Sequence, residues 1–105
     1  MRHKIIFMKL PQFAVYVLYS LKDHQFYIGY TANFTRRMTE HSEGRSKSTA
    51  CRIPFVCVFC EYYLSKYDAL RREHYFKTTA GKRVLRLMLR ESLMLLATLK
   101  KKPSF

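Results

Sequence analysis

One carboxylate stands out among the residues that could do chemistry, because it lies on the apolar side of a predicted helix over residues 66–79. The apolar positions of this stretch recur at helical spacing, at Ala69, Leu70, Phe76 and Ala80. Glu73 falls on the same stripe, and a carboxylate facing a core or cleft loses hydration unless a cation or a donor meets it. Glu73 is therefore a candidate metal ligand or acid/base group, with an ion pair to Lys77 one turn on as the alternative.

The cysteines offer a second chemistry, metal binding, which the local pattern disfavours. Cys57 and Cys60 have zinc-type spacing, with Cys51 and His74 as possible further ligands. Residues 55–60 are β-branched and aromatic, which predicts a strand on which residues three apart point to opposite faces. We therefore expect buried apolar cysteines. An odd count of 3 cysteines, with no recognisable signal cleavage site, predicts a reducing compartment, the cytoplasm.

Tyrosine, arginine and histidine side chains gather around a predicted hairpin and the helix after it. Residues 14–20 and 26–31 are aromatic and β-branched runs separated by polar residues, which predicts a β-hairpin. Arg37 and His41 share one face of a helix that begins after Asn33. Gly29 inside the second run marks a close approach to the backbone, by a DNA strand or a packed tyrosine ring, with a β-bulge as the simpler explanation.

The remaining elements complete one small domain. A basic, hydroxyl-rich loop over residues 44–52 precedes a third strand over 55–63, and Ser65 begins the 66–79 helix. Gly81 is expected to separate that helix from a last one over residues 82–99. The last helix has an apolar side at Leu85, Met88, Ser92, Leu95, Leu96 and Leu99. The 105 residues predict a single α+β domain of order β-β-α-β-α-α, with a small, mainly antiparallel three-stranded sheet.

The charge balance predicts an anionic partner. Lys and Arg number 20 against 7 Asp and Glu, a formal net charge of +13, which favours nucleic acid or an acidic membrane surface. No apolar run approaches the roughly 18 residues of a membrane span. A basic tail carries Lys100, Lys101 and Lys102. The candidate phosphate contacts, whose alternative is a solvated surface, are Arg36, Arg45, Lys47, Arg52, Lys77, Lys82, Arg83, Arg86 and Arg90.

The order of these residues resembles the GIY-YIG nuclease domain. Tyr16 follows Ala14-Val15, Tyr27-Ile28-Gly29 comes eleven residues later, Arg37 ten beyond that, and Glu73 lies after the third strand. The resemblance spans about residues 13–91, leaving a basic C-terminal helix and tail over 82–105. It is closest to short stand-alone bacterial members, which are similar to the N-terminal nuclease portion of the repair endonuclease UvrC.

The resemblance implies a three-stranded antiparallel sheet flanked by helices, and hydrolysis of DNA phosphodiester bonds with Mg²⁺ or Mn²⁺, in DNA repair or recombination. Carried over by position, Tyr16 and Tyr27 would be the paired tyrosines, Arg37 the family arginine, and Glu73 the single metal-binding carboxylate. His41 matches the helix histidine of many members. The general base stays open among these tyrosines and His41, since a phenol with a pKa near 10 needs tuning.

Two positions depart from the family pattern. Ala14 stands in the place of the first glycine of the signature. Tyr30 stands where UvrC-like domains carry a lysine, so that Lys77 is the candidate substitute cation.

The alternative function is a basic nucleic-acid-binding module with little or no cleavage. A weaker one makes the last helix a surface for an acidic membrane or a partner helix. No appended DNA-binding domain is recognised, so a protein partner for targeting is a further expectation, and no small-molecule cofactor besides the metal is expected.

Overall fold

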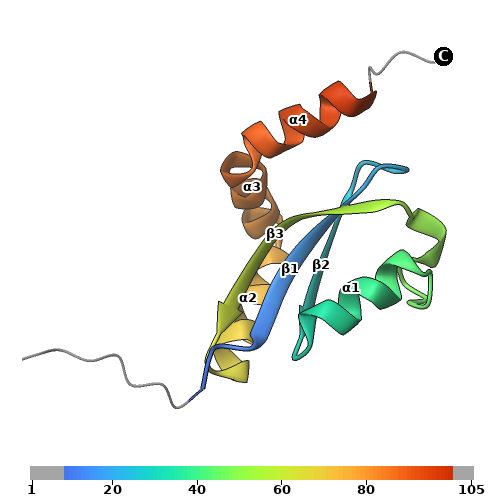
Figure 1. The fold of residues 1–105 in the computed structure, drawn as a ribbon. Helices are drawn as coiled ribbons and strands as arrows, with labels where there is room; N and C mark the ends of the chain where they lie inside the picture. The colour runs from blue at the N-terminus through green and yellow to red at the C-terminus, as the bar shows by residue number, and fades with distance from the viewer. Residues whose placement is uncertain (1–8, 101–105) are drawn as a thin grey trace, which may run out of the picture.

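A computed structural model describes residues 9–100 as an antiparallel sheet with helices against its two faces (Figure 1). The strands are β1 (Phe13–Ser20), β2 (Phe26–Thr31) and β3 (Phe55–Tyr63), arranged in the order β2-β1-β3. The helices are α1 (Phe34–Ser42), α2 (Lys66–Phe76), α3 (Thr79–Met88) and α4 (Arg90–Lys100), with a short 3₁₀ turn η1 (Ala50–Arg52) before β3. The predicted α+β class and the three-stranded antiparallel sheet are confirmed.

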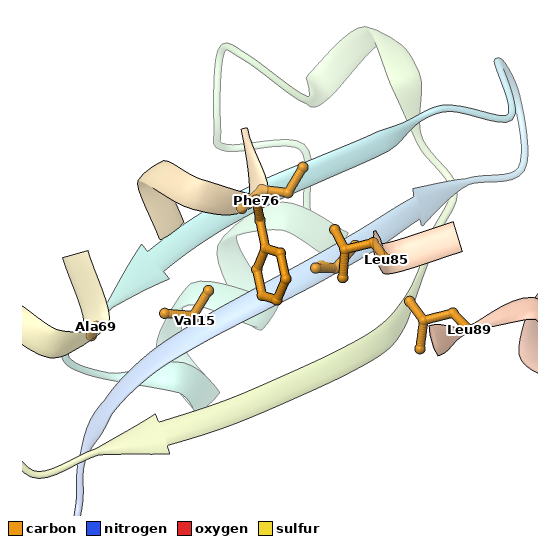
Figure 2. Packing of buried hydrophobic residues seen from close by; sticks show 7 residues of the cluster. Val15, Ala69, Phe76, Leu85 and Leu89 are labelled. Carbon is orange, nitrogen blue, oxygen red and sulfur yellow. The ribbon is translucent and has the colours of Figure 1, made fainter. Parts of the chain in front are cut away.

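The central strand β1 serves both faces of the sheet, because successive side chains point to opposite sides. Val15 and Val17 join the main core beneath α2 and α3, where Phe76 and Leu85 are fully buried (Figure 2). Tyr16 lies on the opposite face and packs against residues of α1. The core and the candidate site are thus built from alternate residues of one strand.

The predicted local signals position the first elements. Asn33 caps α1 by accepting a hydrogen bond from the backbone N–H of Arg36 at 3.1 Å. Gly44, just beyond the end of α1, has φ of +71°, the left-handed conformation that glycine tolerates best. Ser65 accepts from the N–H of Tyr67 at 3.2 Å and so begins α2. Both capping predictions are confirmed.

The C-terminal helices differ from the prediction. The helix expected over 66–79 ends at Phe76, and Thr78 caps a new helix by accepting from the N–H of Gly81 at 3.0 Å. Gly81 therefore lies in the first turn of α3, buried against the end of α2, rather than between two helices. The helix expected over 82–99 is broken at Leu89, which ends α3 and is itself buried.

The break at Leu89 changes which apolar residues are covered. Leu85 and Leu96 of the predicted apolar side are buried, whereas Met88, Leu95 and Leu99 are exposed. Ala80, expected on the stripe of the preceding helix, is exposed in α3. The predicted apolar side over 82–99 requires one continuous helix, and the turn at Leu89 rotates the residues after it.

A β-bulge overturns the expected placement of the cysteines. The register of β1 with β3 shifts between Val17 and Leu18, so that Tyr16 faces Cys60 and Leu18 faces Cys57. Paired residues share a face, so both thiols lie on the α1 side, not on opposite faces. Their predicted burial is also wrong, since Cys51 and Cys57 are exposed and Cys60 is half-buried.

Residues 9–100 contain no group of three or more His, Cys, Asp or Glu side chains placed to hold a metal ion. Over the same residues no helix has the length and apolar character to cross a bilayer. The tail lysines Lys101 and Lys102, and the side chain of Lys100, lie outside the described part of the chain.

Candidate active site

The hydroxyl of Tyr16 is the centre of the candidate site. Tyr16 is 1% exposed, and its oxygen lies 2.8 Å from Nε2 of His41 and accepts a hydrogen bond from Nε of Arg37 at 3.4 Å. The ring of Tyr27, on β2, lies 6.4 Å from that of Tyr16 and 5.3 Å from that of His41. The structure thus brings four predicted site residues together from β1, β2 and α1.

Gly29 makes room for the Tyr16 ring. It is paired with Tyr16 across the β1–β2 ladder, and a Cβ at Gly29 would come closer than 3.0 Å to Cζ, Cε1 and the hydroxyl oxygen of Tyr16. Of the expectations for this glycine, the packed tyrosine ring is therefore confirmed. The bulge is in the other ladder, between β1 and β3.

Arg37 is held by three hydrogen bonds. Besides Nε to Tyr16, one terminal nitrogen donates to Glu40 at 3.0 Å and the other to the hydroxyl of Ser46 at 3.3 Å. Burial alone would lower the pKa of Arg37, but the bonds to Tyr16 and Glu40 outweigh it and raise the pKa. The guanidinium therefore stays charged, and two of its five N–H donors have no partner among these three bonds.

The protonation states at the centre favour a neutral Tyr16 beside a neutral His41. Burial raises the pKa of Tyr16 to about 12, although the hydrogen bond from Arg37 acts in the opposite direction. Burial also lowers the pKa of His41, and the positive charge of Arg37 lowers it further. A protonated phenol therefore rests against an uncharged imidazole, an arrangement in which a proton can pass from oxygen to nitrogen.

Glu73, on α2, influences Tyr16 through its charge, and its side-chain contact in the described residues is with Lys77. Its side chain is 14% exposed, and Oε2 lies 3.0 Å from Nζ of Lys77, so the predicted ion pair is confirmed. The negative charge of Glu73 is among the causes that raise the pKa of Tyr16, after burial. A half-buried carboxylate of this kind fits Mg²⁺, which keeps several waters and needs few protein ligands.

The basic residues predicted to contact phosphate divide by what they already bind. Arg36 and Arg45 form surface ion pairs with Glu40 and Glu43, whereas Lys47 is exposed in the loop after α1. Farther along the chain Lys77 pairs with Glu73, Arg86 lies over the ring of Phe26, and Arg90 donates to the carbonyl of Leu87 at 2.7 Å. Lys82 and Arg83 are exposed.

Arg52 has a structural role that the sequence did not indicate. Its guanidinium pairs with Asp23 and donates to the backbone oxygens of Gln25 and Phe26, both at 3.3 Å. It also lies over the ring of Phe55. These contacts tie the loop before β3 to the β1–β2 hairpin, so few of its donors are left for a phosphate.

Three residues of the site were not singled out from the sequence: Ser46, Ser48 and Thr49. Sequence reasoning placed them in a loop whose hydroxyls could meet phosphates. Ser46 and Thr49 are instead buried, and each of the three contacts a different predicted site residue. The only available signal was the run of hydroxyl residues, which is also common in solvated loops.

Comparison with known proteins identifies the family. The model of the GIY-YIG catalytic domain matches residues 12–86. A UPF0213 protein of Staphylococcus haemolyticus is 37% identical over 70% of this chain and 90% of its own length. One from Natronomonas pharaonis is 40% identical over 74% of this chain and 92% of its own length. The solution structure of a UPF0213 protein from Bacillus halodurans is similar over 72% of this chain and 83% of that chain, at 34% identity and a TM-score of 0.48.

Proposed function

The chain belongs to the GIY-YIG catalytic domain family, a nuclease family, and we propose that it is a metal-dependent endonuclease that hydrolyses phosphodiester bonds in DNA. One observation carries the proposal. The buried hydroxyl of Tyr16 meets both Nε2 of His41 and Nε of Arg37, the combination of a proton carrier, a proton acceptor and a fixed positive charge that hydrolysis needs.

The Tyr16–His41 contact provides a path for the proton of the attacking water. As the water oxygen forms its bond to phosphorus, its proton passes to the Tyr16 oxygen and the Tyr16 proton passes to Nε2 of His41. The bond from phosphorus to the leaving oxygen breaks, and that oxygen takes up a proton from solvent. The high pKa of Tyr16 matters less in such a relay, because free phenolate never accumulates.

Arg37 would stabilise negative charge at two places. Its Nε already donates to Tyr16, where negative charge develops if the two proton transfers are not simultaneous. Its two remaining N–H donors are suited to the oxygens of a phosphate, because guanidinium presents them in a planar fork. Lys47, exposed on the adjacent loop, adds a positive charge for the DNA backbone.

Glu73 would hold the Mg²⁺ or Mn²⁺ ion. When bound, such an ion offsets the charge that develops on the phosphate and on the leaving oxygen. Lys77 pairs with Oε2 of the carboxylate at 3.0 Å and therefore competes with an ion for Glu73. We therefore expect weak metal binding to the free protein and tighter binding when a phosphate supplies further oxygen ligands.

Cleavage assays test the proposal. Purified protein is incubated with Mg²⁺ or Mn²⁺ and with supercoiled, nicked, flapped, branched and single-stranded DNA, beside Glu73→Gln. The control is Glu91→Gln, the same change at an exposed position of α4. We expect Glu73→Gln to lose at least about 100-fold in rate and Glu91→Gln to match the wild type. Equal cleavage by the wild type and Glu73→Gln would refute the metal role, and preference for flapped or branched DNA would support a setting in repair or recombination.

A second candidate function, DNA binding without efficient cleavage, is favoured by the pairing of Glu73 with Lys77. It predicts affinity that falls steeply with salt and no strand scission with either metal ion. The salt dependence should weaken when the exposed arginines Arg83 and Arg90 are changed to Gln. Metal-dependent scission that Glu73→Gln abolishes would exclude this alternative.

A further inference from the structure

The loop residues Ser46, Lys47, Ser48 and Thr49, here called the hydroxyl segment, hold the candidate site from one side. Thr49 Oγ1 lies 2.8 Å from Nδ1 of His41, and Ser48 donates to the hydroxyl of Tyr27 at 3.3 Å. Ser46 accepts from Arg37 at 3.3 Å. One short segment thus contacts three of the residues assigned to catalysis.

We propose that Thr49 is a positioning residue of this site, which fixes the imidazole of His41 so that Nε2 meets the Tyr16 hydroxyl. The inference rests on the proposed function, because the position of Nε2 matters only if His41 takes the proton of Tyr16. Thr49 touches neither Tyr16 nor the reacting atoms in the described contacts, and acts through His41.

The contacts of His41 explain why the single hydroxyl of Thr49 is enough to fix the orientation of the ring. Both ring nitrogens are engaged at 2.8 Å, Nε2 by Tyr16 and Nδ1 by Thr49. A half-turn of the ring would replace both nitrogens by carbons and lose both bonds. His41 is 2% exposed and Thr49 is fully buried, so water cannot readily take the place of the lost hydroxyl.

A hydroxyl also suits both charge states of the ring. When Tyr16 gives its proton to Nε2, the Tyr16 O–H bond breaks, an N–H bond forms, and the ring carries a proton on each nitrogen. Nδ1 is then necessarily a donor, and Thr49 Oγ1 accepts from it while keeping its own hydrogen. The neutral ring that takes this proton has a bare Nε2 and a hydrogen on Nδ1, so Thr49 Oγ1 accepts from Nδ1 before and after the transfer and the contact is kept.

The backbone places Thr49 independently of His41. Its N–H donates to the carbonyl of Ser46 at 3.1 Å, and its own carbonyl accepts from the N–H of Arg52 at 2.9 Å, which closes the η1 turn. Arg52 in turn is bound to Asp23 on the hairpin. Thr49 is therefore preorganised, as a group that orients a catalytic side chain has to be.

The test compares Thr49→Val, which keeps the shape and removes the hydroxyl, with Thr49→Ser, which keeps the hydroxyl. Thr39→Val is the matched control, because Thr39 is exposed on α1 and its hydroxyl bonds only a backbone carbonyl of the same helix. The first readout is the ¹H–¹⁵N spectrum of the His41 ring. We expect a slowly exchanging ring N–H in the wild type, Thr49→Ser and Thr39→Val, and exchange at least about tenfold faster in Thr49→Val.

The second readout is DNA cleavage. We expect Thr49→Val to lower kcat about 10- to 100-fold with KM little changed, and Thr49→Ser to restore most of the rate. Thermal unfolding establishes whether each variant is folded. If Thr49→Val does not fold, Thr49→Ser still tests the proposal. If the wild type cleaves DNA and a folded Thr49→Val matches it, or if Thr49→Ser loses the ring N–H signal, the positioning role is refuted. If the wild type does not cleave but the ring spectrum depends on the hydroxyl, the nuclease proposal fails and the contact stands.

Discussion

Replacing Gly29 by alanine should destabilise the protein through the ring of Tyr16. The added Cβ would lie closer than 3.0 Å to three atoms of that side chain, which real Cβ contacts do not tolerate. Tyr16 cannot easily turn away, because it is packed against the rings of Phe34 and His41 and bonded to the latter. Either β2 has to move away from β1, or the hydroxyl has to leave His41.

The size of the effect follows from these two routes. Overpacking a well-filled site costs about 1–3 kcal/mol, and a buried hydrogen bond lost on one side costs a similar amount. Alanine recovers about 0.5–1 kcal/mol because it restricts the unfolded chain. We therefore expect Gly29→Ala to lower the free energy of unfolding by up to about 2.5 kcal/mol, together with a large loss of any cleavage activity.

Urea denaturation in two backgrounds checks this reasoning. In a Tyr16→Leu protein the ring that meets the Cβ is gone, so Gly29→Ala should cost less than about 1 kcal/mol there. Gly44→Ala is the comparison glycine, since nothing lies within 4 Å of its Cβ and only its φ of +71° is unfavourable. The same cost of Gly29→Ala in both backgrounds would show that the Tyr16 ring is not the cause.

Three further predictions test the electrostatics and the turns. The pKa of His41 should lie below 6.5 in the folded protein. Its contribution to stability is therefore present above pH 6.5 and is lost as the pH falls through the lower folded value. An NMR titration of the ring checks this, and a midpoint above 6.5 would contradict it. Ser20→Ala should lower the free energy of unfolding in urea by about 1–3 kcal/mol. The buried Ser20 hydroxyl donates to the carbonyl of Arg52 and accepts hydrogen bonds from two backbone N–H groups of the hairpin turn. A loss below about 0.5 kcal/mol would contradict this prediction. Arg72→Ala should lower the free energy of unfolding by about 1–2 kcal/mol, because the guanidinium binds Glu61 at 2.6 Å and lies 4.2 Å from the centre of the Phe76 ring. Arg72→Lys should recover only part of this loss. Full recovery in the same assay would exclude the stacking contribution.

The first half of the fold was predictable because local signals and tertiary packing agree there. The aromatic and β-branched runs in residues 14–20 and 26–31, the cap at Asn33 and the glycine at 44 predict strands and a helix end that the structure confirms within a residue. The bulge in the β1–β3 ladder could not be predicted, because it depends on how β3 pairs with a distant strand and leaves no local signal. The break at Leu89 could not be predicted either, because it depends on the burial of that leucine in the core, where the helix is interrupted.

The candidate site likewise contains residues that the sequence predicts and one that it does not. Tyr16, Tyr27, Arg37 and His41 were found because their spacing matches a family signature, and the structure brings them to one place. Thr49 has no such spacing and belongs to a segment whose composition is that of an ordinary loop. Its role depends on a contact between side chains eight positions apart, joined by the irregular backbone after α1, which periodicity does not encode.

The two faces of β1 make stability and chemistry interdependent in this small domain. Val15 and Val17 fix the strand against α2 and α3, and the same backbone fixes Tyr16 between them against α1. A substitution that shifts β1 by a few tenths of an ångström to repack the core also moves the hydroxyl relative to His41, because adjacent residues share one rigid strand. Core variants such as Val17→Ala should therefore lose cleavage activity before they lose the fold. A core variant that is destabilised by about 1 kcal/mol yet fully active would show that the site tolerates such shifts.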